Sequence, residues 1–154
     1  MEQLFIKQLQ DSGADISGER KDIPNILSYQ EAVRLTLDIS AQLAKLHENN
    51  KGFISISKDQ IEMIGDNNFI IKSVDLFRVK STGDLLISKP FQYNDFMAPE
   101  LKNLNTLPET VNSNVGYYCI CKLVLSLLNV ENNLERLRPT KLYFLMERIL
   151  KENS

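Results

Sequence analysis

The stretch FMAPELKNLNTLPETVNSNVGYYCICKLVLSLL, residues 96–128, decides the fold, because it joins a helix-opening motif to a long apolar run. The motif is Ala98-Pro99-Glu100. Proline is favoured in the first turn of a helix, where its missing N–H is not needed, and a carboxylate there faces the positive end of the helix dipole. We therefore expect a helix to begin at Pro99.

The apolar run extends from Tyr117 to Leu128, and its only strongly polar residues are Lys122 and Ser126. A helix that is apolar nearly all round is buried, so we expect this one to be the central element of the core. At about 14 residues, counted from Val115, it is too short to span a bilayer.

The whole chain has 154 residues, of which 43% are hydrophobic and 25% charged, with a formal net charge of −2. These proportions are typical of a soluble globular protein, and we expect residues 1–154 to form a single domain. The balanced charge gives no reason to expect nucleic-acid binding, which needs a basic surface. The N-terminus lacks the basic flank and apolar stretch of a secretory signal, so we expect a cytoplasmic protein without a membrane partner.

Two helices are predicted before the apolar run. A short amphipathic segment, residues 4–9, stops at a turn signal in residues 11–13. Ser28 and Glu31 have the spacing of a capping box, so a long helix should begin there and end near residues 47–50. Its apolar residues recur at steps of three and four: Ala32, Leu35, Ile39, Leu43 and Leu46.

Short runs rich in β-branched and aromatic residues follow the long helix and predict strands at residues 53–56, 61–64, 69–71 and 85–87. Gly65-Asp66-Asn67-Asn68 is the turn expected between the second and third strands. A final amphipathic helix should open at Pro139-Thr140. The predicted fold class is mainly α with small β-hairpins, an α+β domain.

This order of elements resembles the C-terminal lobe of protein kinases, and four motifs occur in the family's order. The segment ISAQLAKLHENN, residues 39–50, is similar to the end of the long helix before the catalytic loop. Residues 52–57 fall where the family has its His-Arg-Asp triplet, and residues 70–77 resemble the strand that leads into Asp-Phe-Gly. Residues 96–100 look like the Ala-Pro-Glu close of the activation segment. The resemblance implies a kinase-like C-terminal lobe.

The catalytic groups of the family are replaced in this sequence. A kinase uses an aspartate to orient and deprotonate the substrate hydroxyl, and an asparagine five residues later to hold magnesium. The match puts Ser57 and Glu62 at these positions, with Ser55 in the triplet segment. Asp75 remains at the magnesium-binding aspartate, but Phe77 replaces the glycine of that motif. We therefore expect no catalysis, no cofactor and no metal.

The upper lobe of a kinase is not expected either. No segment before residue 39 resembles a glycine-rich phosphate loop or the strand that carries the nucleotide-binding lysine. Among kinase relatives, the kinase non-catalytic C-lobe domain is nearest in architecture, and resemblance to it implies binding of a protein or peptide partner. In kinases the glutamate of Ala-Pro-Glu pairs with a later arginine, so Glu100 should meet Arg148 or face water.

The leading hypothesis is a pseudokinase C-terminal lobe that acts as a protein interaction module. An alternative is a decoy that docks on an intact kinase or its substrate and inhibits signalling, as a viral or parasite antagonist would. A third hypothesis is a split kinase completed by another chain, and a fourth is a helical domain unrelated to kinases.

Several other residues are candidates for special roles. Cys119 and Cys121 stand two apart in a predicted helix, where side chains point to different sides, so both should be buried thiols. His47, the only histidine, should hydrogen-bond the backbone beside the catalytic-loop remnant. Phe77 and Phe91 would anchor a partner if exposed and would belong to the core if buried.

Overall fold

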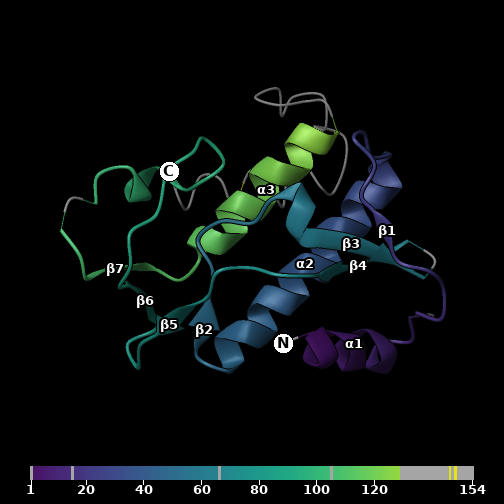
Figure 1. Cartoon of the computed structure of the whole chain (residues 1–154), viewed down its shortest axis with the longest axis horizontal. Helices are drawn as coiled ribbons and strands as arrows, with labels where there is room; N and C mark the ends of the chain where they lie inside the picture. The colour runs from purple at the N-terminus through teal and green to yellow at the C-terminus, as the bar shows by residue number, and fades with distance from the viewer. Residues whose placement is uncertain are drawn as a thin grey trace.

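The computed structural model describes residues 2–14, 16–65, 67–104 and 106–128, together with Met146 and Arg148. These residues form an α+β fold of three α-helices and two antiparallel sheets (Figure 1). The helices are α1 (Glu2–Asp11), α2 (Tyr29–Glu48) and α3 (Val115–Leu127), and two 3-10 turns are η1 (Lys58–Gln60) and η2 (Pro99–Leu101). The predicted α+β class is confirmed, and so are the predicted short helix, the long capped helix and the buried apolar helix.

The strands form two separate sheets. Sheet A has the order β1-β3-β4, and sheet B has the order β2-β5-β6-β7. Their bounds are β1 (Lys21–Asp22), β2 (Lys51–Gly52), β3 (Ile61–Ile64), β4 (Asn68–Ile71), β5 (Phe77–Val79), β6 (Asp84–Ile87) and β7 (Glu109–Asn112). The hairpin predicted at residues 61–71 and the strand predicted at residues 85–87 are therefore confirmed.

Helix α2 begins at a complete capping box. The Ser28 hydroxyl accepts a hydrogen bond from Glu31 N at 3.1 Å, and Glu31 Oε1 accepts one from Ser28 N at 2.9 Å. Both bonds satisfy backbone donors that the first turn of a helix leaves without partners. The sequence pattern therefore located the start of this helix correctly.

Two polar side chains of α2 reach into the interior and bond to strand β4. Asp38 Oδ2 accepts from Phe69 N at 2.9 Å. Gln42 donates to Phe69 O at 2.8 Å and accepts from Ile71 N at 2.9 Å, as a neighbouring strand would. Both side chains are buried, and these bonds offset the cost of removing them from water. These bonds fix the position of helix α2 along strand β4 of sheet A.

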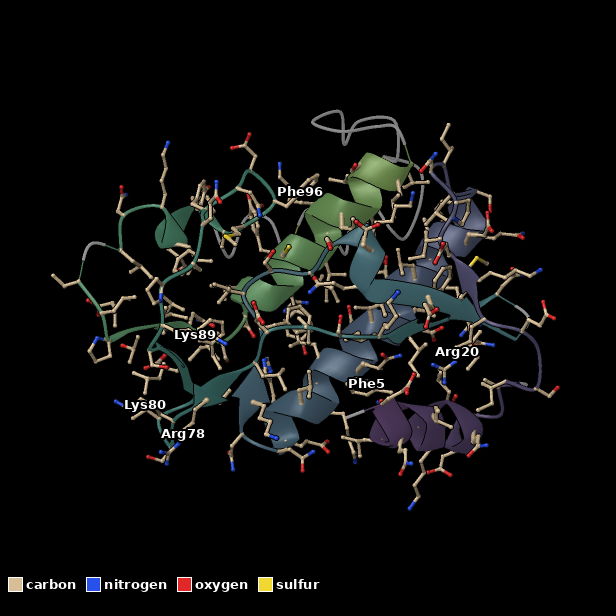
Figure 2. The ribbon with its side chains drawn as sticks, viewed as in Figure 1. Phe5, Arg20, Arg78, Lys80, Lys89 and Phe96 are labelled. Atoms are coloured by element: carbon tan, nitrogen blue, oxygen red, sulfur yellow. The ribbon has the colours of Figure 1, made fainter. Side chains whose placement is uncertain are left out.

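The larger of two hydrophobic cores lies between α1, α2, α3 and sheet A (Figure 1). Its fully buried side chains include Phe5, Leu35, Ile39, Leu43, Phe69, Ile70, Ile71, Cys119, Val124 and Met146. Phe5 of α1, labelled in Figure 2, packs into this core. Arg20 also ties α1 to sheet A, because its guanidinium ion-pairs with Glu2 and lies 3.7 Å from Glu62 Oε1. We call this region the large core.

The second cluster lies under sheet B, and we call it the small core. It contains the inward side chains of β5, β6 and β7, residues around η2 and the first turn of α3: Ile54, Phe77, Val79, Leu85, Ile87, Met97, Ala98, Leu101, Val111, Val115 and Tyr118. Inward and outward residues alternate along β5, where Phe77 and Val79 are buried and Arg78 is exposed. This alternation is what one covered face of a sheet requires.

The strand expected at residues 53–56 is wrong. Strand β2 ends at Gly52, and the following residues are irregular although Phe53, Ile54 and Ile56 are buried. The physical reason is that the backbone of this segment bonds to a side chain of α3 in place of a neighbouring strand. Cys119 Sγ is 3.4 Å from Ile56 N and 3.6 Å from Ile56 O, and bonds to both.

The helix expected at Pro99 does begin at that residue, but η2 is a single 3-10 turn and no α-helix continues from it. Leu101 is buried but Lys102 and Asn103 are exposed, so no apolar stripe continues beyond the first turn. The sequence pattern missed β1, β2, β5 and β7, which have two to four residues each. Of the final helix expected after Pro139, only Met146 and Arg148 are described, both helical, and the rest lies outside the described residues.

Candidate functional site

The candidate site forms where β2 and β5 pair. Gly52 stands opposite Phe77 in an antiparallel register, although the hairpin β3–β4 lies between them in sequence. The chain therefore leaves β2, passes through residues 53–60, makes the hairpin and returns to β2. This closure places the loop at residues 53–60 beside the segment at residues 72–76.

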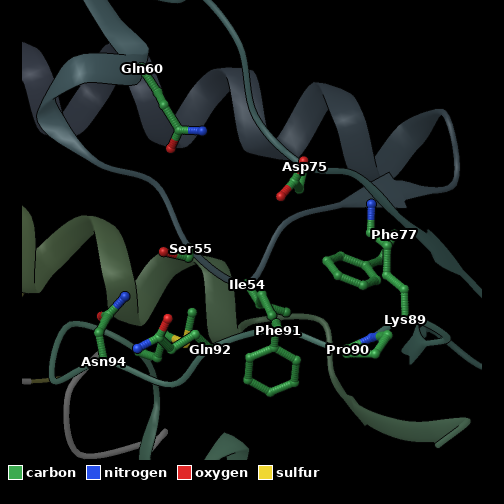
Figure 3. A pocket seen from close by; sticks show the side chains of 11 residues that line it. Ile54, Ser55, Gln60, Asp75, Phe77, Lys89, Pro90, Phe91, Gln92 and Asn94 are labelled. Carbon is green, nitrogen blue, oxygen red and sulfur yellow. The ribbon is translucent and has the colours of Figure 1, made fainter.

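A pocket of about 260 Å³ opens between these two segments and the irregular segment that follows β6. Its lining residues are Ile54, Ser55, Gln60, Asp75, Phe77, Lys89, Pro90, Phe91, Gln92, Asn94 and Met97. Figure 3 shows Gln60 and Asp75 on one side of the pocket and Phe91 and Gln92 on the other, with Ser55 between them. We call this the Asp75 pocket.

One carboxylate and one ammonium group line the Asp75 pocket. Asp75 is exposed, and Lys89 Nζ lies 5.0 Å from the centre of the Phe77 ring, a cation–π distance. Phe77 is a core residue, whereas Phe91 is half-buried and remains accessible from the pocket. The site therefore combines one accessible aromatic ring with opposite charges.

The structure separates the predicted catalytic positions. Ser55 and Asp75 meet in the Asp75 pocket, whereas Ser57 lies outside it. Glu62 is on β3, opposite Ile70, and its carboxylate faces Arg20 at 3.7 Å. Ser57 and Glu62 therefore do not share a site with Asp75.

Gln60 is the site residue that the sequence pattern missed. Its side-chain oxygen accepts from Ser57 N at 3.0 Å and from Ser57 Oγ at 3.4 Å, and its backbone oxygen accepts from Lys72 N at 2.7 Å. These bonds fix Gln60 at the mouth of the hairpin. The available signal was its distance of five residues from Ser55, the spacing of the kinase base and its asparagine.

A second pocket of about 300 Å³ shares Ser55 and Asn94 with the first. Its other lining residues are Ile56, Ser57, Lys58, Asp59, Phe96, Leu123, Ser126 and Leu127. Because α3 and Phe96 supply large apolar side chains, we call it the apolar pocket. The two pockets adjoin across the Ser55–Asn94 wall.

Helix α3 holds the loop that lines both pockets. A Cβ atom at Gly116 would lie 2.8 Å from Phe53 O and 2.8 Å from a methyl group of Leu43, so the helix approaches the loop too closely for any side chain there. One turn later, the Cys119 thiol bonds to both backbone groups of Ile56. Burial raises the pKa of the Cys119 thiol, which keeps it protonated and able to donate.

The Ala-Pro-Glu residues lie near the site without lining it. Ala98 is fully buried in the small core, next to Met97 of the Asp75 pocket. Pro99 and Glu100 are exposed on η2, so Glu100 faces water. The motif therefore supports the wall of the pocket through Ala98.

Both cysteines are buried free thiols, as predicted, and burial raises the pKa of Cys121 to about 12. His47 lies edge-on to Tyr117 with ring centres 5.8 Å apart. Its Nε2 atom is buried without a hydrogen-bond partner among the described residues, so the predicted backbone bond is wrong for that atom. Burial lowers the pKa of His47, because a charged ring would lose its hydration there.

Three wider findings complete the description. Within the described ranges, no group of His, Cys, Asp or Glu side chains is arranged to hold a metal ion. Among the same residues, no helix has both the length and the apolar character needed to cross a bilayer. Comparison with family models, curated proteins and solved structures finds no match to this chain.

Proposed function

We propose that the chain is a non-catalytic protein-binding module with the fold of a protein kinase C-terminal lobe. The observation that carries the proposal is that Ser55, Gln60 and Asp75 line one pocket. A kinase needs an aspartate, an asparagine and an aspartate at a site of this kind. Here only one of the three groups is a carboxylate.

The path of the chain supports the kinase-like fold. A loop, a hairpin and a return strand follow the long helix α2, and the return strand begins two residues after Asp75. In the family, the same order carries the catalytic loop and then the magnesium-binding aspartate. The pairing of Gly52 with Phe77 brings both ends of that path to one pocket.

The pocket also favours a different alignment of this chain with the kinase catalytic loop from the one that places Ser57 and Glu62 at the catalytic positions. Ser55 and Gln60 are five residues apart, which is the spacing of the kinase base and its asparagine, and both line the pocket with Asp75. Ser57 and Glu62 have the same spacing, but Glu62 faces Arg20 on sheet A. We therefore assign the two positions to Ser55 and Gln60.

The start of α3 lacks the family's anchoring aspartate, whether that position is aligned with Asn114 or with Gly116. Kinases begin their buried helix with an aspartate that anchors the catalytic loop, and Gly116 stands in the first turn of α3 against Phe53 O. The 2.8 Å approach leaves no room for an aspartate side chain. The Cys119 thiol holds the loop instead, through Ile56.

These replacements remove phosphoryl-transfer chemistry. A serine hydroxyl cannot act as the base at neutral pH, and loss of a positioned base alone costs about 10²–10⁴ in rate. Magnesium prefers carboxylate and phosphate oxygens, and a single carboxylate binds it weakly. The residues of the Asp75 pocket therefore do not fit a catalytic metal site.

What remains is suited to binding a peptide. The Asp75 pocket offers polar groups and the half-buried Phe91 ring, and the adjoining apolar pocket accepts an apolar side chain. Binding sites typically combine an apolar surface with a few placed polar groups. An extended segment that crosses the Ser55–Asn94 wall would contact both pockets.

The register is tested by restoring the lost groups. Ser55→Asp combined with Gln60→Asn should create Mn²⁺ binding that disappears when Asp75→Ala is added. The matched control, Ser57→Asp combined with Glu62→Asn, should not bind Mn²⁺, because its residues do not face Asp75. Binding is measured from the loss of the free-Mn²⁺ electron paramagnetic resonance signal, and binding by the control alone would show the register to be wrong.

The lack of catalysis is tested on the unaltered protein with radiolabelled ATP. No transfer of labelled phosphate to itself or to a generic protein substrate is expected. Transfer that disappears in Asp75→Ala would overturn the proposal. Protein binding is tested by a photo-crosslinking benzoylphenylalanine at Phe91, with Tyr29 as the exposed control position; a partner should crosslink from position 91 and not from 29.

A further inference from the structure

We infer that the outer face of sheet B is a docking surface for an acidic peptide segment of a protein partner. Lys51, Arg78 and Lys80 would bind the carboxylates of that segment. We call these three residues the cationic face. Lys51 is on β2, Arg78 is in the middle of β5 and Lys80 directly follows β5, and Arg78 projects from the side of the sheet opposite the small core. Figure 2 shows Arg78 and Lys80 projecting from the same end of the sheet into solvent.

Two of the cations stand directly opposite each other. Lys51 pairs with Arg78 across the antiparallel ladder, and Val79 N donates to Asn50 O at 2.8 Å on one side of that pair. This pattern makes Lys51 and Arg78 a non-hydrogen-bonded pair, in which the two side chains come closest. Like charges directly opposite in a sheet are unfavourable. Folding alone therefore gives no reason for this pair.

In the part of the chain that the structure describes, no carboxylate forms an ion pair with the cationic face. Among the described residues, ion pairs join Arg20, Arg34 and Lys45 to carboxylates, and none involves Lys51, Arg78 or Lys80. Asp84 stands across from Lys80, whose backbone N donates to Asp84 O at 2.8 Å, and its carboxylate accepts from the Thr82 hydroxyl at 3.4 Å. Three cations beside one carboxylate leave this face with a net positive charge that an external anion can neutralise.

The same cross-strand row continues with an apolar and a hydroxyl side chain. Arg78 stands opposite Leu86, and Leu86 stands opposite Thr110. Leu86 is half-buried and Thr110 is exposed. A segment laid across the strands would meet two cations and then an apolar side chain, which fits acidic residues followed by an apolar one.

The extent of the surface favours a peptide over a nucleic acid. Nucleic-acid binders rely on many phosphate contacts and a broadly basic surface. The chain as a whole carries a net charge of −2, and the basic area consists of three side chains on one sheet face. A short run of carboxylates matches that area.

The probe is a fluorescein-labelled peptide of glutamates with one leucine near its end, and binding is followed by fluorescence anisotropy at low and physiological salt. The unaltered protein should bind it, more weakly as salt screens the charges. Lys51→Gln combined with Arg78→Gln should weaken binding by roughly fivefold or more. The matched control, Lys7→Gln combined with Lys21→Gln, makes the same charge change on α1 and β1 and should leave affinity unchanged.

Each outcome decides the inference. Failure of the unaltered protein to bind the peptide, or equal loss of affinity in the control, would overturn it. Equal or tighter binding of a single-stranded oligonucleotide would overturn the assignment to a peptide. A melting temperature that stays constant or rises in the Lys51/Arg78 variant would exclude misfolding as the cause, because the substitution removes a repulsion.

This inference rests on the proposed function, since both describe a protein-binding module. The experiments can contradict either the proposed function or the docking surface on sheet B without contradicting the other. The Mn²⁺ and phosphate-transfer tests depend on residues of the Asp75 pocket, whereas Lys51 and Arg78 lie outside both pockets. Catalysis by the unaltered chain would therefore end the proposed function while peptide binding at sheet B could still be measured.

Discussion

The two cores of the molecule differ in how their polar groups are satisfied. Around the large core, Asp38 and Gln42 reach from α2 to the backbone of β4 and complete its hydrogen bonding. Beside the small core, Asp75 is exposed and the cationic face has no internal partner among the described residues. The difference indicates that α2 and sheet A form the scaffold, whereas sheet B and the Asp75 pocket leave charged groups exposed to solvent, as the proposed binding role requires.

The largest effect is expected from a matched pair of leucine truncations. Leu35 in the large core and Leu85 in the small core are both fully buried. We expect Leu35→Ala to cost about 4 kcal/mol and Leu85→Ala about 2.5 kcal/mol, because a site between helices collapses less easily than one under short strands. Chemical denaturation measures both values, and a larger cost for Leu85→Ala would reverse the scaffold assignment.

The next largest loss in the free energy of unfolding is expected when the hydrogen bonds between α2 and β4 are removed. Gln42→Ala leaves Phe69 O and Ile71 N without their side-chain partner, and we expect a loss of about 3 kcal/mol. Asn49→Ala removes an exposed bond to Lys45 O and serves as the control, with an expected loss under about 1 kcal/mol. Equal losses in denaturant titrations would mean that these hydrogen bonds add nothing beyond an exposed bond.

Asp38 should make stability fall as pH rises. Burial raises the pKa of its carboxyl from the ordinary 3.8 to about 6, with the bond from Phe69 and the charge of Arg34 opposing the shift. The folded protein therefore holds the proton more tightly than the unfolded chain does. The contribution is full below about pH 4 and is lost as pH rises through 6, on the order of 2 kcal/mol in all.

Asp38→Asn should flatten this slope in denaturation experiments between pH 4 and pH 7, because asparagine keeps an oxygen acceptor for Phe69 N. Asp75→Asn is the matched control, since its carboxylate is exposed, and it should preserve the slope. Retention of the slope in Asp38→Asn would assign the effect to another group.

The smallest effect is expected in the Asp75 pocket. Asp75→Ala should change the free energy of unfolding by less than about 0.5 kcal/mol, because the side chain is exposed and makes no hydrogen bond or ion pair within the described residues. A loss above 2 kcal/mol in denaturant titrations would mean that Asp75 is part of the scaffold and is not kept for binding.

Local patterns predicted the helices and the hairpin well. The capping box at Ser28 and the apolar steps of α2 act within one or two turns, so they can be read without knowing the fold. The local pattern gave a wrong prediction at residues 53–56, because an apolar run looks the same in a strand and in a loop that bonds to a helix. Gln60 was missed because only the folded chain shows that it lines a pocket with Ser55 and Asp75.

The amino-acid sequence by itself determined the α+β class and the buried character of α3, since these follow from composition and short-range periodicity. Only the tertiary structure decided that Gly52 meets Phe77, that Lys51 faces Arg78 and that Cys119 holds Ile56. Such contacts depend on the register in which distant segments close, and side-chain periodicity contains no information about the partner of a strand.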